Sequence, residues 1–107
     1  MDYRTAVYEG IKKAPIQAIR KWFSVSPDQP FAACVNGAAL LGLGLSVSNL
    51  VSRLGKSTLV LEAFPELSST VICPVCKASG TVFKHTMALN DDHRWSREQI
   101  ADWVAGL

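Results

Sequence analysis

The stretch FAACVNGAALLGL, at residues 31–43, decides the fold of this chain. At 3.6 residues per turn, its apolar side chains cover nearly the whole surface of a helix, and a helix that is apolar all round is buried on all sides. We therefore predict that residues 31–43 form the central helix of the core. The glycines of LGLGLS, at residues 41–46, are expected to end this helix, because glycine readily adopts the left-handed conformation found after helices.

The apolar run around this helix is long enough to raise the question of a membrane span. Residues 29–52 contain no charged residue, and that length could cross a bilayer. However, Asn36 and Asn49 lie inside the run, and Lys and Arg occur on both sides of it, so no preferred orientation is visible. Small residues such as Ala38 and Gly42 suit close helix packing in either environment. We favour a buried helix followed by a turn and a second helix, and no membrane insertion.

Composition limits the class of protein. The chain has 107 residues, of which 49% are hydrophobic and 19% are charged, as expected for one folded domain spanning residues 1–107. Its net charge of +2 does not favour strong non-specific nucleic-acid binding, which needs a concentrated basic surface. The N-terminus has no signal-peptide pattern, and three unevenly spaced cysteines make no disulfide framework. These features predict a cytoplasmic protein with reduced thiols.

The residues before the central helix predict further helices. Apolar residues recur at helical spacing over 3–13, and Pro15 suits the first position of a new helix whose apolar face is Ile16, Ile19, Trp22 and Phe23. The run SVSPDQP at 24–30 contains two prolines and predicts a loop. After the central helix, Ser46 or Ser48 can cap a short helix through Leu54, with Gly55 left-handed after it and Lys56 at its C-terminal end.

The C-terminal third mixes extended and helical patterns. Residues 59–67 fit a helix or a strand, and Pro65 ends either. The β-branched stretches at 69–73 and 80–85 predict a small hairpin, and Ser96 with Gln99 predicts a capping box that starts a final helix. The expected fold is mostly α: a compact domain of four to five helices. A helical core covers 1–67, and a strand–CPVC knuckle–strand–helix unit covers 68–107.

The chemistry of the chain is concentrated between Cys73 and His93. Cys73 and Cys76 are separated by two residues, so a tight turn can direct both sulfurs at one ion, and the only two histidines, His85 and His93, follow at C-x8-H-x7-H spacing. Zinc prefers four thiolate and imidazole ligands in a tetrahedron. We predict a zinc knuckle with Cys73, Cys76, His85 and His93 as ligands. Because four protein ligands would fill the coordination shell, the Zn²⁺ would be structural rather than catalytic.

Several alternatives to this site remain open. The spacing is not that of a DNA-reading zinc finger, and the two cysteines could instead be inert thiols or a redox dithiol. His93, next to the final helix, is the stronger histidine, whereas His85 could be replaced by Asp91, Asp92 or Cys34, although Cys34 suits a core position.

Two further patterns suggest enzymatic chemistry only weakly. The GKS at 55–57 lacks the earlier glycine of a phosphate-binding loop, because that position is Leu50. The cluster LNDDHR at 89–94 could support acid–base catalysis, but Asn and Asp before a helix are common capping residues and no nucleophile accompanies them. We therefore predict that the protein is not an enzyme.

Two segments carry a resemblance. The stretch AACVNGAALLGLG is similar to an A-C-x-x-G-A-A-L-x-G helix, and LNDDHRWSREQIADWV to a closing LND…WSREQIADWV motif, of small uncharacterised phage and prophage proteins. The resemblance covers about a third of the chain. It implies origin and architecture rather than mechanism. Our leading expectation is a non-enzymatic accessory protein in the cytoplasm of a bacterial host cell, which binds a protein partner such as a host factor. The alternative is a nucleic-acid-binding transcriptional regulator that uses the knuckle and a basic face of Lys12, Lys13, Arg20 and Lys21.

Overall fold

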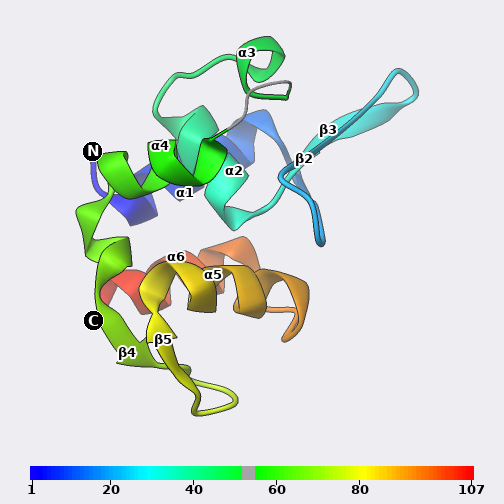
Figure 1. Cartoon of the computed structure of the whole chain (residues 1–107). Coiled ribbons are helices and arrows are strands. Elements are labelled where there is room, and N and C mark those ends of the chain that lie inside the picture. The colour runs from blue at the N-terminus through cyan, green and yellow to red at the C-terminus, as the bar shows by residue number, and fades with distance from the viewer. Residues whose placement is uncertain (52–54) are drawn as a thin grey trace.

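The computed structural model describes residues 1–51 and 55–107, and this part of the chain is mostly helical with two small sheets (Figure 1). This confirms the predicted fold class, although the described residues contain six α-helices rather than four or five. The helices are α1 (Tyr3–Lys13), α2 (Val35–Gly42), α3 (Val47–Val51), α4 (Lys56–Ala63), α5 (Val82–Asp91) and α6 (Arg97–Ala105), with a 3-10 turn η1 (Pro65–Ser68). The strands are β1 (Ile16–Gln17), β2 (Phe23–Ser26), β3 (Gln29–Ala33), β4 (Thr70–Ile72) and β5 (Ser79–Thr81).

Helices α1 and α2 meet at small residues. A side chain on Gly10 would overlap the backbone carbonyl of Ala38, and one on Gly42 would overlap that of Ala6. The two backbones are therefore in direct contact, which only glycine permits at these positions. All residues of α2 from Val35 to Leu41 are buried, as the apolar pattern of this stretch predicts.

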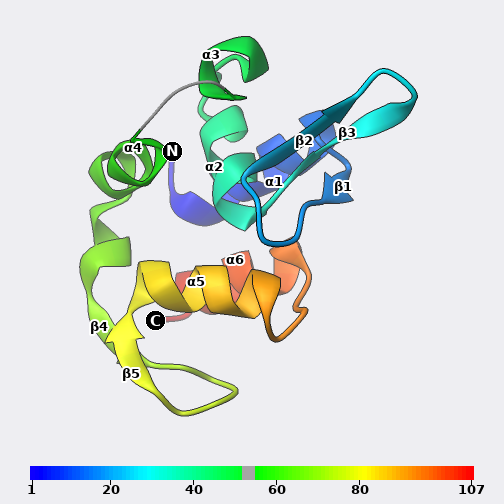
Figure 2. The same cartoon turned by 45° about the vertical axis from the view of Figure 1, so that its right-hand side comes forward.

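The segment between α1 and α2 differs from the prediction. A second helix was expected from Pro15 and a loop at 24–30, but residues 16–33 form a three-stranded sheet with the order β1-β3-β2. Strand β1 pairs in parallel with β3, and β2 pairs with β3 in an antiparallel hairpin that projects from the body (Figure 2). Arg20 has φ +61°, which ends any helix through this region, and the rings of Phe23 and Phe31 stack at 5.7 Å.

The central helix also begins later than expected. Residues 31–33 belong to β3, and Cys34 occupies the N-cap of α2, where its sulfur accepts a hydrogen bond from the Gly37 N–H at 3.3 Å. The helix therefore starts at Val35 rather than at residue 31. Pairing of β3 with both β1 and β2 outweighs the helical periodicity of residues 31–33.

The elements after α2 agree in part with those predicted from the sequence. Gly55 is left-handed at φ +81°, but Lys56 begins α4 instead of ending the preceding helix. The predicted helix through Leu54 is observed as α3 as far as Val51, and residues 52–54 lie outside the described part. The ambiguous stretch 59–67 is helical in its first half, and Pro65 follows the end of α4.

The C-terminal elements confirm the hairpin and the capping box. Strands β4 and β5 pair in an antiparallel hairpin, and both hydrogen bonds of the Ser96–Gln99 capping box are present at the start of α6. The second extended segment is shorter than expected, because the Thr81 hydroxyl accepts from the Lys84 N–H and starts α5 at Val82. His85 is consequently helical.

Two polar side chains join the C-terminal helices to the rest of the core. Arg97, only 3% exposed, donates to the carbonyls of Ala14 (2.6 Å), Ala33 (3.2 Å) and Pro15 (2.8 Å). Asn90 accepts from the N–H of Val35, the first residue of α2, at 3.0 Å. These side chains thus satisfy backbone groups that the C-terminus of α1 and the N-terminus of α2 leave without helical partners.

Among the described helices, none is long and apolar enough to cross a membrane.

Candidate metal centre

The turn between β4 and β5 holds the two neighbouring cysteines. We call residues 73–77 the knuckle. The Cys73 N–H donates to the Ala78 carbonyl at 2.9 Å, and the Lys77 N–H donates to the Cys73 carbonyl at 3.2 Å. Lys77 has φ +64°, a left-handed conformation that is rare outside glycine. A left-handed residue after a turn directs successive N–H groups to one side, where they form a concave site for an anion such as a thiolate.

Backbone N–H groups of this turn act on the Cys73 thiol. Burial of Cys73, which is 0% exposed, disfavours its thiolate, but the backbone N–H groups of Cys76 and Val75 and the Cys76 side chain outweigh that effect and lower the pKa of the Cys73 thiol. Metals bind the thiolate form, so a lowered pKa favours binding. Cys76 is exposed. The knuckle therefore presents one inner and one outer sulfur.

His93 reaches the same place from the loop between α5 and α6. Its N–H donates to the Ala88 carbonyl at 3.0 Å, and the Trp95 N–H donates to the Leu89 carbonyl at 2.9 Å, so the loop is folded back on the end of α5. A ligand atom of Cys73, one of Cys76 and one of His93 all lie within 4.8 Å of one another. Three of the four predicted ligands are thus close enough to hold a metal ion.

His85 lies apart from this group. It is 5% exposed, and its Nε2 atom is 2.9 Å from the Val71 carbonyl oxygen. A carbonyl only accepts hydrogen bonds, so Nε2 carries the proton and Nδ1 keeps the lone pair. As the side chains are placed, His85 does not join the group of Cys73, Cys76 and His93. The ring also makes an edge contact with Trp103, at 6.3 Å between centroids. His85, which lies on α5, therefore holds strand β4 at Val71, two residues before Cys73.

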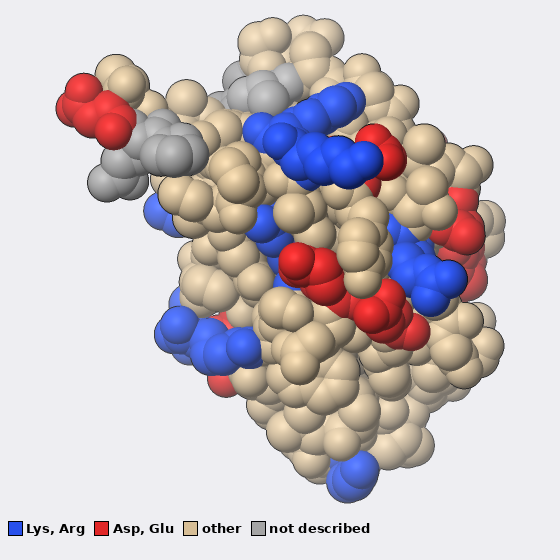
Figure 3. All heavy atoms as spheres, turned by 180° about the vertical axis from the view of Figure 1, so that it is seen from behind, with Lys and Arg blue, Asp and Glu red and all other residues tan. Residues whose placement is uncertain are grey.

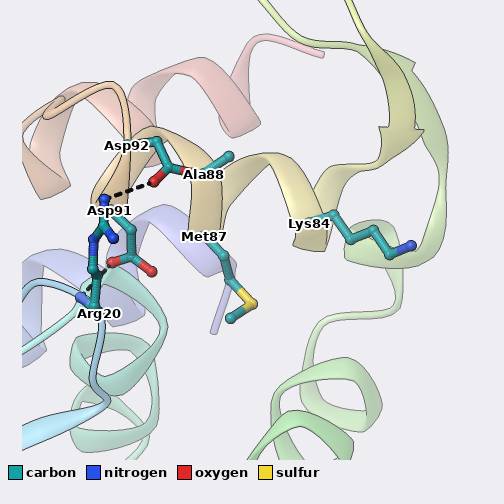
Figure 4. A pocket seen from close by; sticks show the side chains of 6 residues that line it. All are labelled: Arg20, Lys84, Met87, Ala88, Asp91 and Asp92. Atoms are coloured by element: carbon teal, nitrogen blue, oxygen red, sulfur yellow. Dashed lines mark hydrogen bonds and ion pairs between the residues drawn. The ribbon is translucent and has the colours of Figure 1, made fainter.

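The other residues considered as a fourth ligand also have partners elsewhere. Figure 4 shows the Asp91 and Asp92 side chains directed at Arg20 beside a cavity of about 350 Å³. Asp91 accepts from the Arg20 backbone N–H and from the Asn90 amide, both at 2.8 Å, and Asp92 pairs with the Arg20 guanidinium at 3.3 Å. Cys34 caps α2, and burial raises the pKa of its thiol to about 11. Its sulfur is neither anionic nor near the knuckle group.

The polar cluster at 89–94 contains residues with structural contacts and one residue of the candidate metal group. Asn90 is 1% exposed; besides capping α2, its amide donates to the Ala18 carbonyl at 2.9 Å. Asn90 and Asp91 are therefore fixed by backbone contacts, and of this cluster only His93 joins the cysteines. The roles of Asn90 and Arg97 were not predicted from the sequence. The signal that could have indicated their burial is that each shares a helix face with apolar residues that are also buried.

The expected basic face is divided by acidic and backbone partners. Lys12 pairs with Glu9 at 2.9 Å, the Lys13 ammonium donates to the Leu41 carbonyl at 2.9 Å, and Arg20 pairs with Asp92. On the face drawn in Figure 3, Lys and Arg lie beside Asp and Glu rather than in one broad basic area. Opposite charges this close weaken the local positive potential.

Comparison with known proteins adds no relative from which a function could be transferred. The chain matches no protein-family model, no curated protein and no solved structure.

Proposed function

We propose that the chain is a zinc-stabilised, non-enzymatic accessory protein of phage or prophage type that binds another protein. The observation that carries the metal part is the convergence of Cys73, Cys76 and His93 within 4.8 Å. In a tetrahedral zinc site, bonds of about 2.3 Å to sulfur and 2.0 Å to nitrogen place two sulfurs and one nitrogen roughly 3.5–3.8 Å apart. Only a small closure of the three side chains is needed to reach that geometry.

Zinc suits this donor set better than other common ions. Two thiolates and an imidazole are borderline-soft ligands, which bind Zn²⁺ well and Mg²⁺ or Ca²⁺ poorly. The two thiolates also balance the charge of the ion. The metal would join the knuckle to the loop between α5 and α6, two segments that are distant in sequence, and would therefore stabilise the C-terminal part of the fold.

Apolar side chains around the knuckle support a protein partner. Ile72, which precedes Cys73, is 55% exposed, and Val75, which precedes Cys76, is 43% exposed. Exposed apolar residues that lie close together on a surface are typical of protein-binding sites. We favour a protein over a nucleic acid because Lys12 and Arg20 of the basic face are engaged with acidic side chains.

The metal is tested by purifying the protein without added zinc and measuring its metal content and thermal unfolding, with and without a chelator. We expect one zinc ion per chain and a lower melting temperature after chelation. Cys73→Ser and His93→Ala should each lower the zinc content. Cys34→Ser is the matched control, because serine also caps helices and Cys34 lies outside the metal group.

The result that would overturn the metal site is a purified protein free of metal whose stability is unchanged by the chelator. A Cys73–Cys76 disulfide in that protein would favour the redox alternative. For the partner, capture from a bacterial lysate should depend on the knuckle. Ile72→Lys with Val75→Lys should abolish it, whereas Val25→Lys, at a side chain 62% exposed on the other hairpin, should not.

A further inference from the structure

We propose that the metal held by Cys73, Cys76 and His93 keeps its fourth coordination position open to solvent, and that this position takes a monodentate nitrogen or sulfur donor from outside the chain. This inference rests on the proposed metal binding. It departs from the closed four-ligand site that the sequence predicts, and it changes what the site can do. An open position can accept a side chain of a partner or a small ligand, whereas a closed site only fastens the fold.

The first argument is that the described chain supplies three donors. Within residues 1–51 and 55–107, no fourth Cys, His, Asp or Glu joins the group of Cys73, Cys76 and His93. The residues outside this description are Ser52, Arg53 and Leu54, none of which is a usual zinc ligand. Zinc with three protein ligands completes its tetrahedron with water or another external donor.

The second argument is that each nearby alternative is held in another interaction. His85 donates through Nε2 to the Val71 carbonyl, and its ring lies against Trp103. Asp91 accepts two hydrogen bonds at 2.8 Å, and Asp92 is paired with Arg20 (Figure 4). None of these residues joins the group of Cys73, Cys76 and His93, so each would have to move to become a ligand. Such a move would disturb contacts that are already formed.

The third argument is the direction from which the ion is reached. Cys73 is buried and His93 is partly buried, whereas Cys76 is exposed. The exposed Cys76 marks the solvent side of the group, and we infer that the open position faces outward beside it. Ile72 and Val75, both exposed, lie along the same hairpin and would contact the body of an incoming ligand.

Charge and softness define the class of ligand. Two thiolates neutralise a divalent ion, so a neutral donor such as water or imidazole adds no net charge, and a thiol can bind after releasing its proton to solvent. Imidazole and thiolate are better zinc donors than oxygen ligands. We therefore assign the position to a histidine or cysteine side chain, or to a small molecule with the same group.

The experiment uses the full chain loaded with Co²⁺, whose absorption bands report the number and type of ligands. Titration with imidazole, and separately with 2-mercaptoethanol, should shift the ligand-field bands in a saturable way while the two cysteine-to-cobalt charge-transfer bands remain. His85→Gln should behave like the wild type, because glutamine retains a donor for the Val71 carbonyl. If a second copy supplies the donor, the spectrum will also change on dilution, and imidazole will compete with that change.

Two results would overturn the inference while leaving the metal site intact. One is a cobalt spectrum that does not respond to saturating imidazole or thiol. The other is a spectrum that changes in His85→Gln in the way expected for loss of one nitrogen ligand, which would mean that His85 closes the site. Absence of any cysteine-to-cobalt charge transfer would instead reject the metal site itself, and with it the open position.

Discussion

The contact between α1 and α2 and the knuckle hairpin are stabilised in opposite ways. At the first, Gly10 and Gly42 let two helix backbones touch, and the surrounding apolar residues are buried. At the second, a pair of three-residue strands and the turn between them carry exposed Ile72 and Val75, and hydrogen bonds, one of them from His85, hold the hairpin. Burial of apolar side chains is sufficient to hold the helix pair together. The hairpin buries too little apolar surface and needs a further constraint. The metal ion that we propose would supply that constraint.

The largest expected effect is at the helix contact. Gly10→Val places a side chain where the Ala38 carbonyl lies, so the helices must separate, and we expect a loss of about 3 kcal/mol or more in the free energy of unfolding. Chemical denaturation measures this. Gly106→Ala is the control, because its added carbon would meet its nearest neighbour at 3.6 Å, an ordinary contact. Equal stability of the two variants would show that α1 and α2 are not closely packed.

The next effect tests the link between the two regions. Arg97→Met removes three hydrogen bonds to the carbonyls of Ala14, Ala33 and Pro15, and leaves part of that buried backbone without a donor. We expect a loss of about 2–3 kcal/mol, because charged hydrogen bonds to buried groups are among the stronger ones. Lys21→Met removes the same charge at an exposed position and should change the free energy of unfolding little. A similar loss in both variants would argue for a general charge effect.

A smaller effect is expected at His85. His85→Phe keeps an aromatic ring but loses the donor to the Val71 carbonyl, which should cost about 1 kcal/mol and weaken metal affinity by loosening the strand before Cys73. His85→Gln should recover most of both. Competition with a metal-sensitive dye measures the affinity. In contrast to His93→Ala, neither variant should change the ligand set seen in the cobalt spectrum.

The smallest effect concerns the start of α1. The hydrogen bonds from the backbone and side chain of Thr5 lower the pKa of Asp2 below its ordinary value of 3.8. A carboxylate with a depressed folded-state pKa stabilises fully above the unfolded value, and this contribution is lost as pH falls through the folded pKa. The melting temperature of the wild type should therefore exceed that of Asp2→Asn at neutral pH. The difference should shrink as pH falls below 3.8 and disappear once pH is below the lowered pKa of Asp2 in the folded state. A constant difference would mean that the charge of Asp2 is not involved.

The polar residues of the C-terminal segment show why part of the site was predictable and part was not. The C-x2-C spacing is local, so one turn brings the two sulfurs together whatever the rest of the fold does. His93 follows from its place beside the helix that Ser96 caps. His85 was placed in an extended segment, but Thr81 starts a helix four residues earlier, and this turns the imidazole toward Val71. The Thr81 cap thus leaves His85 outside the group of Cys73, Cys76 and His93.

The sheet shows the same limit in the N-terminal half. Residues 16–23 have helical spacing of apolar side chains, yet β1 forms because β3, which follows it by more than ten residues, offers a parallel edge. Asn90 and Arg97, near the C-terminus of the chain, then fix this arrangement. Asn90 accepts from the N–H of the first residue of α2, and Arg97 donates to the carbonyl at the end of α1. Spacing along a sequence carries no information about such distant partners.

The sequence by itself determined the buried centre at α2, the hairpin around the two cysteines and the capped final helix. These depend on interactions within a few residues: apolar periodicity, a tight turn, and a serine that bonds to the backbone three positions on. Only the tertiary structure decided that residues 16–33 are a sheet, that His93 rather than His85 meets the sulfurs, and that three protein donors gather there. Those outcomes depend on which distant carbonyls and N–H groups need partners once the helices have packed.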